Sequence, residues 1–188
     1  MSFRKALASS LQGAELTKHS TGRAGPVVHL ADLPLTHEVH GAQFEAFLAP
    51  VAAPAGASHI GARLCVVPPG KSAWPHHCHH ANDELFVILE GQGELRLGTA
   101  VYAFRRNDVL VCSAGGRETA HRIRNTGAET LRYLAVSSMR EPDIMEYPDS
   151  RKWGAFAGAA PGGKAAERTF SAFVREEARV DDWDGEEE

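Results

Sequence analysis

Between residues 26 and 140 the chain alternates short apolar runs with turn residues. The runs are four to eight residues long, and Gly, Pro, Asn or Asp separates them. Such spacing is typical of antiparallel strands, and no long helical period interrupts it. The pattern predicts an all-β sandwich or closed barrel, and closure would remove exposed sheet edges. The expected strands are Phe44–Leu48, His59–Val67, His77–His79, Glu84–Glu90, Gly93–Leu97, Val101–Phe104, Val109–Cys112, His121–Asn125 and Leu131–Ser137.

A turn is expected at Gly91-Gln92-Gly93, between the apolar run that ends at Glu90 and the one that follows. Both glycines can adopt a positive φ without steric cost, as a tight hairpin requires. The sequence therefore predicts a β-hairpin between Glu90 and Glu94.

The segments on either side of this region have a different character. Residues 1–25 are small and polar without a sustained period, which indicates a loosely held N-terminal arm or an exchanged edge segment. Residues 26–140 form the expected barrel, and residues 141–188 form a C-terminal extension. No internal repeat is visible, so one barrel is expected rather than two.

The C-terminal extension is predicted to be irregular. Pro142, Pro148 and the Gly/Ala-rich stretch Gly154–Lys164 indicate loops, and Ala165–Arg179 is compatible with a short helix or strand. The last thirteen residues hold eight acids and one Arg, which predicts a solvated tail with Trp183 as its only candidate anchor.

Composition and charge narrow the function classes. The 188 residues are 43% hydrophobic and 23% charged, as in one globular domain. A formal net charge of −4 and the lack of a Lys/Arg run argue against nucleic acid as a partner. There is neither an apolar run long enough for a membrane span nor a secretory signal, so a soluble, cytoplasmic protein is expected.

The three cysteines, Cys65, Cys78 and Cys112, form no CxxC pair and are odd in number. We therefore expect free thiols in a reducing compartment rather than a disulfide scaffold.

The stretch from Pro75 to Glu84 carries the candidate chemistry. On one strand, His77 and His79 would share a face, and Glu84 would meet them after a turn. His121, which begins a later apolar run after Gly115-Gly116, is the fourth candidate ligand. Neutral imidazoles with one carboxylate suit Fe, Mn, Ni, Cu or Zn, and four protein ligands leave coordination positions open for water or substrate.

Neighbouring residues have alternative interpretations. His76 and His80 are assigned to the surface or to contacts behind the ligands, although His80 would replace a ligand if the register slipped by one residue. Cys78 should point away from the metal by strand alternation, and Cys112 is interpreted as a packing residue.

Four residues are candidates for the substrate pocket. Arg63 and Tyr133 could face the cavity and bind an anionic or hydroxylated substrate, although a surface salt bridge is an equal alternative for Arg63. Trp74 precedes the expected strand His77–His79 and is placed at the mouth of the barrel or in ordinary packing. Strand parity from Glu84 puts Phe86 inside the barrel, in the core first and in the pocket wall second. No catalytic residue beyond the metal ligands is assigned.

These residues resemble the two motifs of the cupin superfamily over residues 60–137. Gly70, His77-Cys78-His79, Glu84 and Gly91 follow the first motif, with six residues between Gly70 and His77 where five are usual. The second motif is matched more loosely. Asn107 stands where Gly is usual and Ser113 where Pro is common, and the motif continues with Asp108, Gly115, His121 and Asn125.

The resemblance implies a cupin double-stranded β-helix, a jelly-roll barrel with one divalent metal ion, Zn, Fe, Mn or Ni, held by His77, His79, Glu84 and His121. Segments 133–150 and 180–186 are also similar to uncharacterised bacterial single-barrel cupins likened to sugar-phosphate isomerases. The implied function is a metal-dependent enzyme on a small molecule, either isomerase-like or Fe-dependent dioxygenase-like. The alternative is a non-catalytic module that binds or senses a small ligand. Single-barrel cupins pair, which implies a homodimer.

Overall fold

The computed structural model describes residues 25–186, and within this range the fold is all-β. Its only helices are 3₁₀ turns of three residues: Leu30–Asp32, Ala53–Ala55, Arg117–Thr119, Pro148–Ser150, Ala165–Glu167 and Glu176–Ala178. No helix in the described range is long and apolar enough to cross a membrane. The expected N-terminal arm, apart from its last residue, lies outside the described residues.

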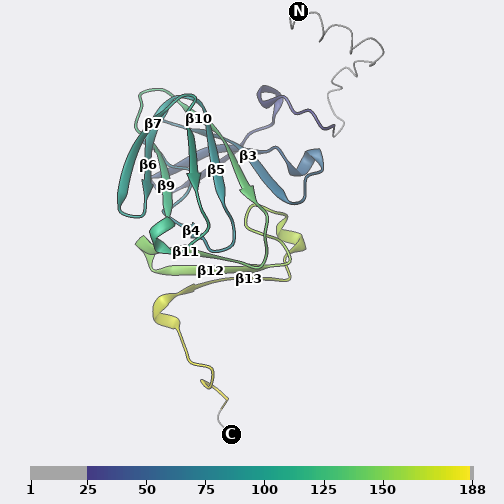
Figure 1. The fold of residues 1–188 in the computed structure, drawn as a ribbon, viewed down its shortest axis with the longest axis vertical. Helices are drawn as coiled ribbons and strands as arrows, with labels where there is room; N and C mark the ends of the chain where they lie inside the picture. The colour runs from purple at the N-terminus through teal and green to yellow at the C-terminus, as the bar shows by residue number, and fades with distance from the viewer. Residues whose placement is uncertain (1–24, 187–188) are drawn as a thin grey trace, which may run out of the picture.

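In the described part of the chain, thirteen strands form three sheets. Figure 1 shows their arrangement. The six-stranded sheet has the order β1-β2-β3-β10-β5-β8, and the three-stranded sheet has the order β7-β6-β9. The four-stranded sheet has the order β13-β12-β11-β4. The strand bounds are β1 Thr36–His40, β2 Phe44–Pro50, β3 Ile60–Val67, β4 Cys78–His79, β5 Glu84–Glu90, β6 Gln92–Leu97, β7 Ala100–Arg105, β8 Val109–Cys112, β9 His121–Asn125, β10 Leu131–Ser138, β11 Asp143–Tyr147, β12 Lys152–Ala157 and β13 Phe170–Arg175.

The hydrophobic core lies between the six-stranded and three-stranded sheets. Alternate residues of β3, β5 and β10 point into it, as the period of two predicts, and residues of β6, β7 and β9 close it from the other side. Below this core, β11, β12 and β13 run across one end of the barrel (Figure 1). The core includes Leu48, Cys65, Val67, Phe86, Ile88, Leu95, Phe104, Ile123, Leu131 and Tyr133.

The expected strands between residues 44 and 138 are all present, within a few residues of the predicted bounds. The expectation of an irregular chain after residue 140 is wrong for two segments. β11 and β12 pair in antiparallel register from Asp143↔Phe156 to Tyr147↔Lys152, and β13 extends this sheet. The flanking Pro142 and Pro148 lie outside the strand, so their missing N–H groups do not interrupt the ladder.

The predicted hairpin at Gly91 is also wrong. The chain does turn there, with φ of +84° at Gly91, but β5 pairs with β8 and β10 whereas β6 pairs with β7 and β9. The turn therefore carries the chain from one sheet to the other. Gly93 allows two strands to approach closely, because a Cβ at this position would lie 2.3 Å from the Arg124 carbonyl oxygen of the adjacent strand.

The three cysteines are buried and free, which confirms the expectation of free thiols. Burial raises the pKa of Cys65 and of Cys112 to about 12, so both thiols stay protonated at neutral pH. Trp183 does not anchor the acidic tail, since 78% of its surface is exposed.

Two asparagines of the second motif have separate structural roles. Asn107 has φ of +73°, the left-handed conformation that Gly adopts most readily and that Asn also tolerates. The fully buried side chain of Asn125 donates hydrogen bonds to the carbonyl oxygens of Val67 and Glu129, both at 2.9 Å, and accepts one from the Gly127 amide. Asn125 thus joins the end of β3 to the loop after β9.

Replacing Asn125 with Ala should lower the free energy of unfolding by about 2–4 kcal/mol, because buried carbonyl groups lose their donors. Asn107→Gly is the matched control, and we expect a change within about 0.5 kcal/mol because Gly tolerates positive φ. Urea denaturation followed by circular dichroism measures both. Equal stabilities of the Asn125→Ala variant and the wild type would contradict this role.

Candidate metal centre

Four side chains converge at the end of the barrel that the C-terminal sheet covers. His77 and His79 come from the segment around β4, Glu84 begins β5 and His121 begins β9. His77 and His121 are paired directly, because the amide of each donates to the carbonyl of the other at 3.1 and 2.7 Å. This bridge brings residues 44 positions apart in the sequence onto one face.

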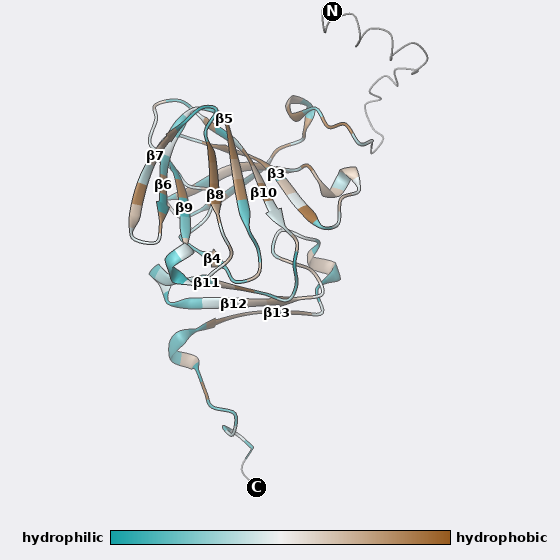
Figure 2. Ribbon diagram, viewed as in Figure 1, coloured by the Kyte–Doolittle hydropathy of each residue, from teal (hydrophilic) through white to brown (hydrophobic). Residues whose placement is uncertain are grey.

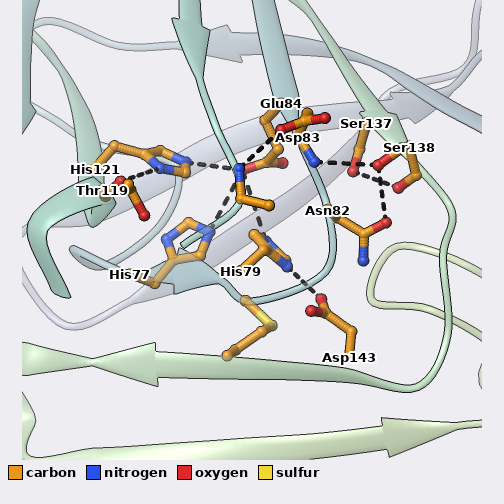
Figure 3. A network of polar contacts seen from close by, with 12 residues as sticks. His77, His79, Asn82, Asp83, Glu84, Thr119, His121, Ser137, Ser138 and Asp143 are labelled. Carbon is orange, nitrogen blue, oxygen red and sulfur yellow. Dashed lines mark hydrogen bonds and ion pairs between the residues drawn. The ribbon is translucent and has the colours of Figure 1, made fainter. Parts of the chain in front are cut away.

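The three imidazoles surround one carboxylate oxygen. The Oε2 atom of Glu84 lies 2.8 Å from His121 Nε2, 3.6 Å from His79 Nε2 and 3.9 Å from His77 Nε2. Figure 3 shows the three rings directed toward Glu84. The histidines are each less than 10% exposed, so bulk water does not separate these groups.

The far side of each ring faces an acceptor. His77 Nδ1 lies 2.8 Å from the Pro75 carbonyl oxygen, and His121 Nδ1 lies 3.4 Å from that of Thr119. His79 Nδ1 lies 2.6 Å from Oδ2 of the buried Asp143. These acceptors favour the proton on Nδ1 and leave the Nε2 lone pairs directed at the cluster.

The electrostatics favour a neutral His77 imidazole beside an ionised Glu84 carboxylate. Burial, together with the nearby His121, lowers the pKa of His77 to about 3. Burial opposes ionisation of Glu84, but contact with His121 and the nearby His79 outweigh it and lower its pKa to about 2. Neutral nitrogen and anionic oxygen donors are the states in which these side chains bind metals.

These residues fit a divalent metal ion. The buried atoms Glu84 Oε2 and His121 Nε2 have no hydrogen-bond partner of suitable geometry, although burial without one is costly. The ligand atoms of His77, His79 and Glu84 lie within 4.8 Å of one another, and His121 adds a fourth nitrogen beside Glu84. One cation at the centre would satisfy all four donors.

The cluster opens into a cavity of about 670 Å³, a size suited to a small molecule. The candidate pocket residues Arg63, Trp74, Phe86 and Tyr133 all line it. The Arg63 guanidinium carbon lies 5.9 Å from the centre of the Trp74 ring, and no carboxylate of the described chain forms a salt bridge with it. Phe86 and Tyr133 are buried and meet edge to face, so each serves both core and wall.

The alternative ligands lie elsewhere. His80 is exposed and contacts Glu146. His76 is buried, and its Nε2 atom lies 2.9 Å from the Ala120 carbonyl oxygen. Cys78 contacts Glu146 rather than Glu84, as alternation predicted. Cys112 is part of the core cluster.

Sequence reasoning missed Asp143, which holds His79, and Met145, which lines the cavity. Both point inward from β11, whose short alternating pattern was hidden between two prolines. Asp143 also accepts a hydrogen bond from the Ala81 amide at 2.9 Å, so it fixes the strand as well as the ring.

Comparison with known proteins agrees with this fold. Residues 63–137 match the family model of the cupin domain. A candidate sugar phosphate isomerase of Acidithiobacillus ferrooxidans superposes with a TM-score of 0.68 at 23% identity, over 82% of this chain and 96% of its own. A cupin-superfamily sugar phosphate isomerase of Silicibacter pomeroyi superposes with a TM-score of 0.66 at 18% identity, over 81% of this chain and 94% of its own.

A predicted oxalate decarboxylase of Thermotoga maritima gives a TM-score of 0.52 at 24% identity, over 60% of this chain and 97% of its own. A comparison with curated proteins finds no match. The shared folds confirm the double-stranded β-helix expected from the sequence.

Asp143→Ala should weaken Zn²⁺ binding by about 10–100-fold, because His79 loses the carboxylate that orients it. Asp149→Ala is the matched control: this aspartate contacts Arg96 and His76 but none of His77, His79, Glu84 and His121, so the affinity of this variant should match that of the wild type. Competition with a chromophoric chelator measures the Zn²⁺ affinity of the wild type and of both variants. Equal affinities for Asp143→Ala and the wild type would contradict the orienting role.

Proposed function

We propose that this chain, a member of the cupin superfamily whose residues 63–137 form the cupin domain, is a metal-dependent enzyme acting on a small anionic molecule. The metal ligands would be His77, His79, Glu84 and His121. The observation that supports this most is the convergence of three Nε2 atoms on Glu84 Oε2, at 2.8–3.9 Å, inside a cavity of about 670 Å³.

The protein side chains around this cavity have separate tasks. A bound divalent ion would supply Lewis-acid polarisation of a substrate carbonyl or hydroxyl group. Asp143 and the Pro75 carbonyl would keep His79 and His77 in the ligating tautomer. Trp74, Phe86 and Tyr133 would exclude water from the substrate and present it with an apolar wall.

Arg63 supports an anionic substrate. It lies on β3 with the same parity as the core residue Cys65, so it faces inward, and it lacks an acidic partner among residues 25–186. A guanidinium is suited to bidentate binding of phosphate or carboxylate. We therefore favour a sugar phosphate as substrate and isomerisation as reaction, the activity named for the similar folds from Acidithiobacillus and Silicibacter.

We also propose a cytoplasmic homodimer. The free, buried thiols suit a reducing compartment. The outer face of β5 and β8 carries Leu85, Val87, Val109 and Val111, with the last two 52% and 60% exposed, and Figure 2 shows the hydrophobic colour of both strands. Because β8 is an edge strand, a second copy could cover this apolar face and pair with its open edge.

Protein purified without chelator should contain divalent metal, and a His77→Ala/His121→Ala variant should contain about one ion per chain fewer than the wild type, because this pair supplies two of the four ligands. Elemental analysis makes this measurement. Zn or Ni directs assays to aldose–ketose interconversion of sugar phosphates, followed by NMR, whereas Fe with substrate-dependent oxygen uptake would overturn the isomerase assignment. No metal after reconstitution would overturn the site.

Arg63→Met should weaken binding of inorganic phosphate by about 10–100-fold, the loss expected for charge-assisted hydrogen bonds. The metal content should stay unchanged, since Arg63 contacts no ligand. Arg132→Met is the control, because Arg132 pairs with Glu90 at the surface and not in the cavity. Calorimetric titration distinguishes them, and an equal affinity for Arg63→Met and Arg132→Met would contradict the assignment.

In solution scattering at micromolar concentration the chain should have twice the mass of one copy. Val111→Glu places a charge on the outer face of β8 and should shift the mass toward the monomer. Val101→Glu, on the exposed part of β7, serves as the control and should remain dimeric. A monomeric wild type would rule out the dimer.

A further inference from the structure

Strand β4 has a second face, which the proposed function does not use. His77 and His79 point to the cavity, whereas Cys78 and His80 alternate to the other side. On the neighbouring β11, Glu146 is the register partner of Cys78. Directly paired residues of antiparallel strands share a face, so the thiol, the imidazole and the carboxylate meet there.

We propose that Cys78, His80 and Glu146 form a second metal site, for Zn²⁺, on the outer face of the β4–β11 pair. The Glu146 Oε2 atom lies 3.3 Å from His80 Nε2 and 4.0 Å from Cys78 Sγ, and all three ligand atoms lie within 4.8 Å of one another. Metal bonds of about 2.0–2.3 Å in a tetrahedron separate neighbouring ligand atoms by about 3.3–3.8 Å. The distance from Glu146 to His80 already lies in this range, and the distance from Glu146 to Cys78 is slightly above it.

Burial at the site is graded from inside to outside. The side chain of Cys78 is buried, that of Glu146 is 24% exposed and that of His80 is 45% exposed. An ion can therefore enter past His80 and bind the sulfur in a sheltered position, with one coordination position left to water. On binding, the thiol proton leaves to solvent and a Zn–S bond replaces the S–H bond.

The charges around Glu146 leave the relevant oxygen available. Arg117 Nε approaches the other carboxylate oxygen, Oε1, at 3.8 Å, and Arg117 is itself paired with Glu176. Arg117 thus orients the carboxylate without occupying Oε2, and Glu176 balances its charge. The donor set of one thiolate, one imidazole and one carboxylate favours Zn²⁺ over Mg²⁺ or Ca²⁺, which prefer oxygen alone.

This outer site differs chemically from the inner site of His77, His79, Glu84 and His121, which contains no sulfur. Co²⁺ can therefore report on the two sites separately. Anaerobic titration of the full chain should bind two equivalents of Co²⁺ and produce a near-ultraviolet sulfur-to-cobalt charge-transfer band. Cys78→Ser should abolish the band and retain one equivalent. His80→Ala, at an exposed position where folding is not at risk, should also lose one equivalent.

Cys112→Ala is the matched cysteine control. Cys112 is the register partner of Glu84 and does not belong to the outer site, so its loss should leave the band intact. A band that persists in Cys78→Ser, or that disappears in Cys112→Ala, overturns the outer site, as does a wild type without the band. The His77→Ala/His121→Ala variant keeps the band and one equivalent if the outer site is correct. A wild type with the band but only one equivalent would instead count against the inner site alone.

Discussion

The site depends on one backbone contact, the reciprocal pair of hydrogen bonds between His77 and His121 at 3.1 and 2.7 Å. It ties the segment before β4 to the start of β9 and sets two imidazoles side by side with ring centres 4.8 Å apart. Glu84 then follows β4 after a short turn, so its carboxylate reaches the same point. Without the bridge, the candidate ligands on β4, β5 and β9 would belong to three separate sheets with no common centre.

The same bridge brings together buried polar groups that a cation would satisfy. Three imidazoles whose Nδ1 atoms face acceptors direct lone pairs at a carboxylate oxygen, and burial prevents water from compensating fully. Preorganised donors of this kind are an expected property of a metal site, because the protein rather than the ion has met the cost of ordering them.

The features that the sequence could predict are those set by local period. Alternation placed His77 and His79 together and turned Cys78 away, and the turn before His121 marked the start of its strand. Features decided by pairing between distant segments were not predictable. Gly91 has the conformation of a hairpin turn, yet β5 and β6 separate into different sheets, because the partners of each strand lie elsewhere in the chain. Asp143 was missed for the same reason, since only the β4–β11 register shows that it faces His79.

The C-terminal sheet is therefore part of the site and not an appendage. The family match ends at residue 137, yet the carboxylate that orients His79 stands at position 143 and the cavity wall includes Met145. β11 pairs with β4 on its edge, so its inward residues reach the inner cluster while Glu146, of opposite parity, reaches Cys78. A shift of β11 by one residue would exchange these two sets, removing Asp143 from His79 and Glu146 from Cys78 together. The side-chain clusters on both faces of β4 thus depend on a single strand register.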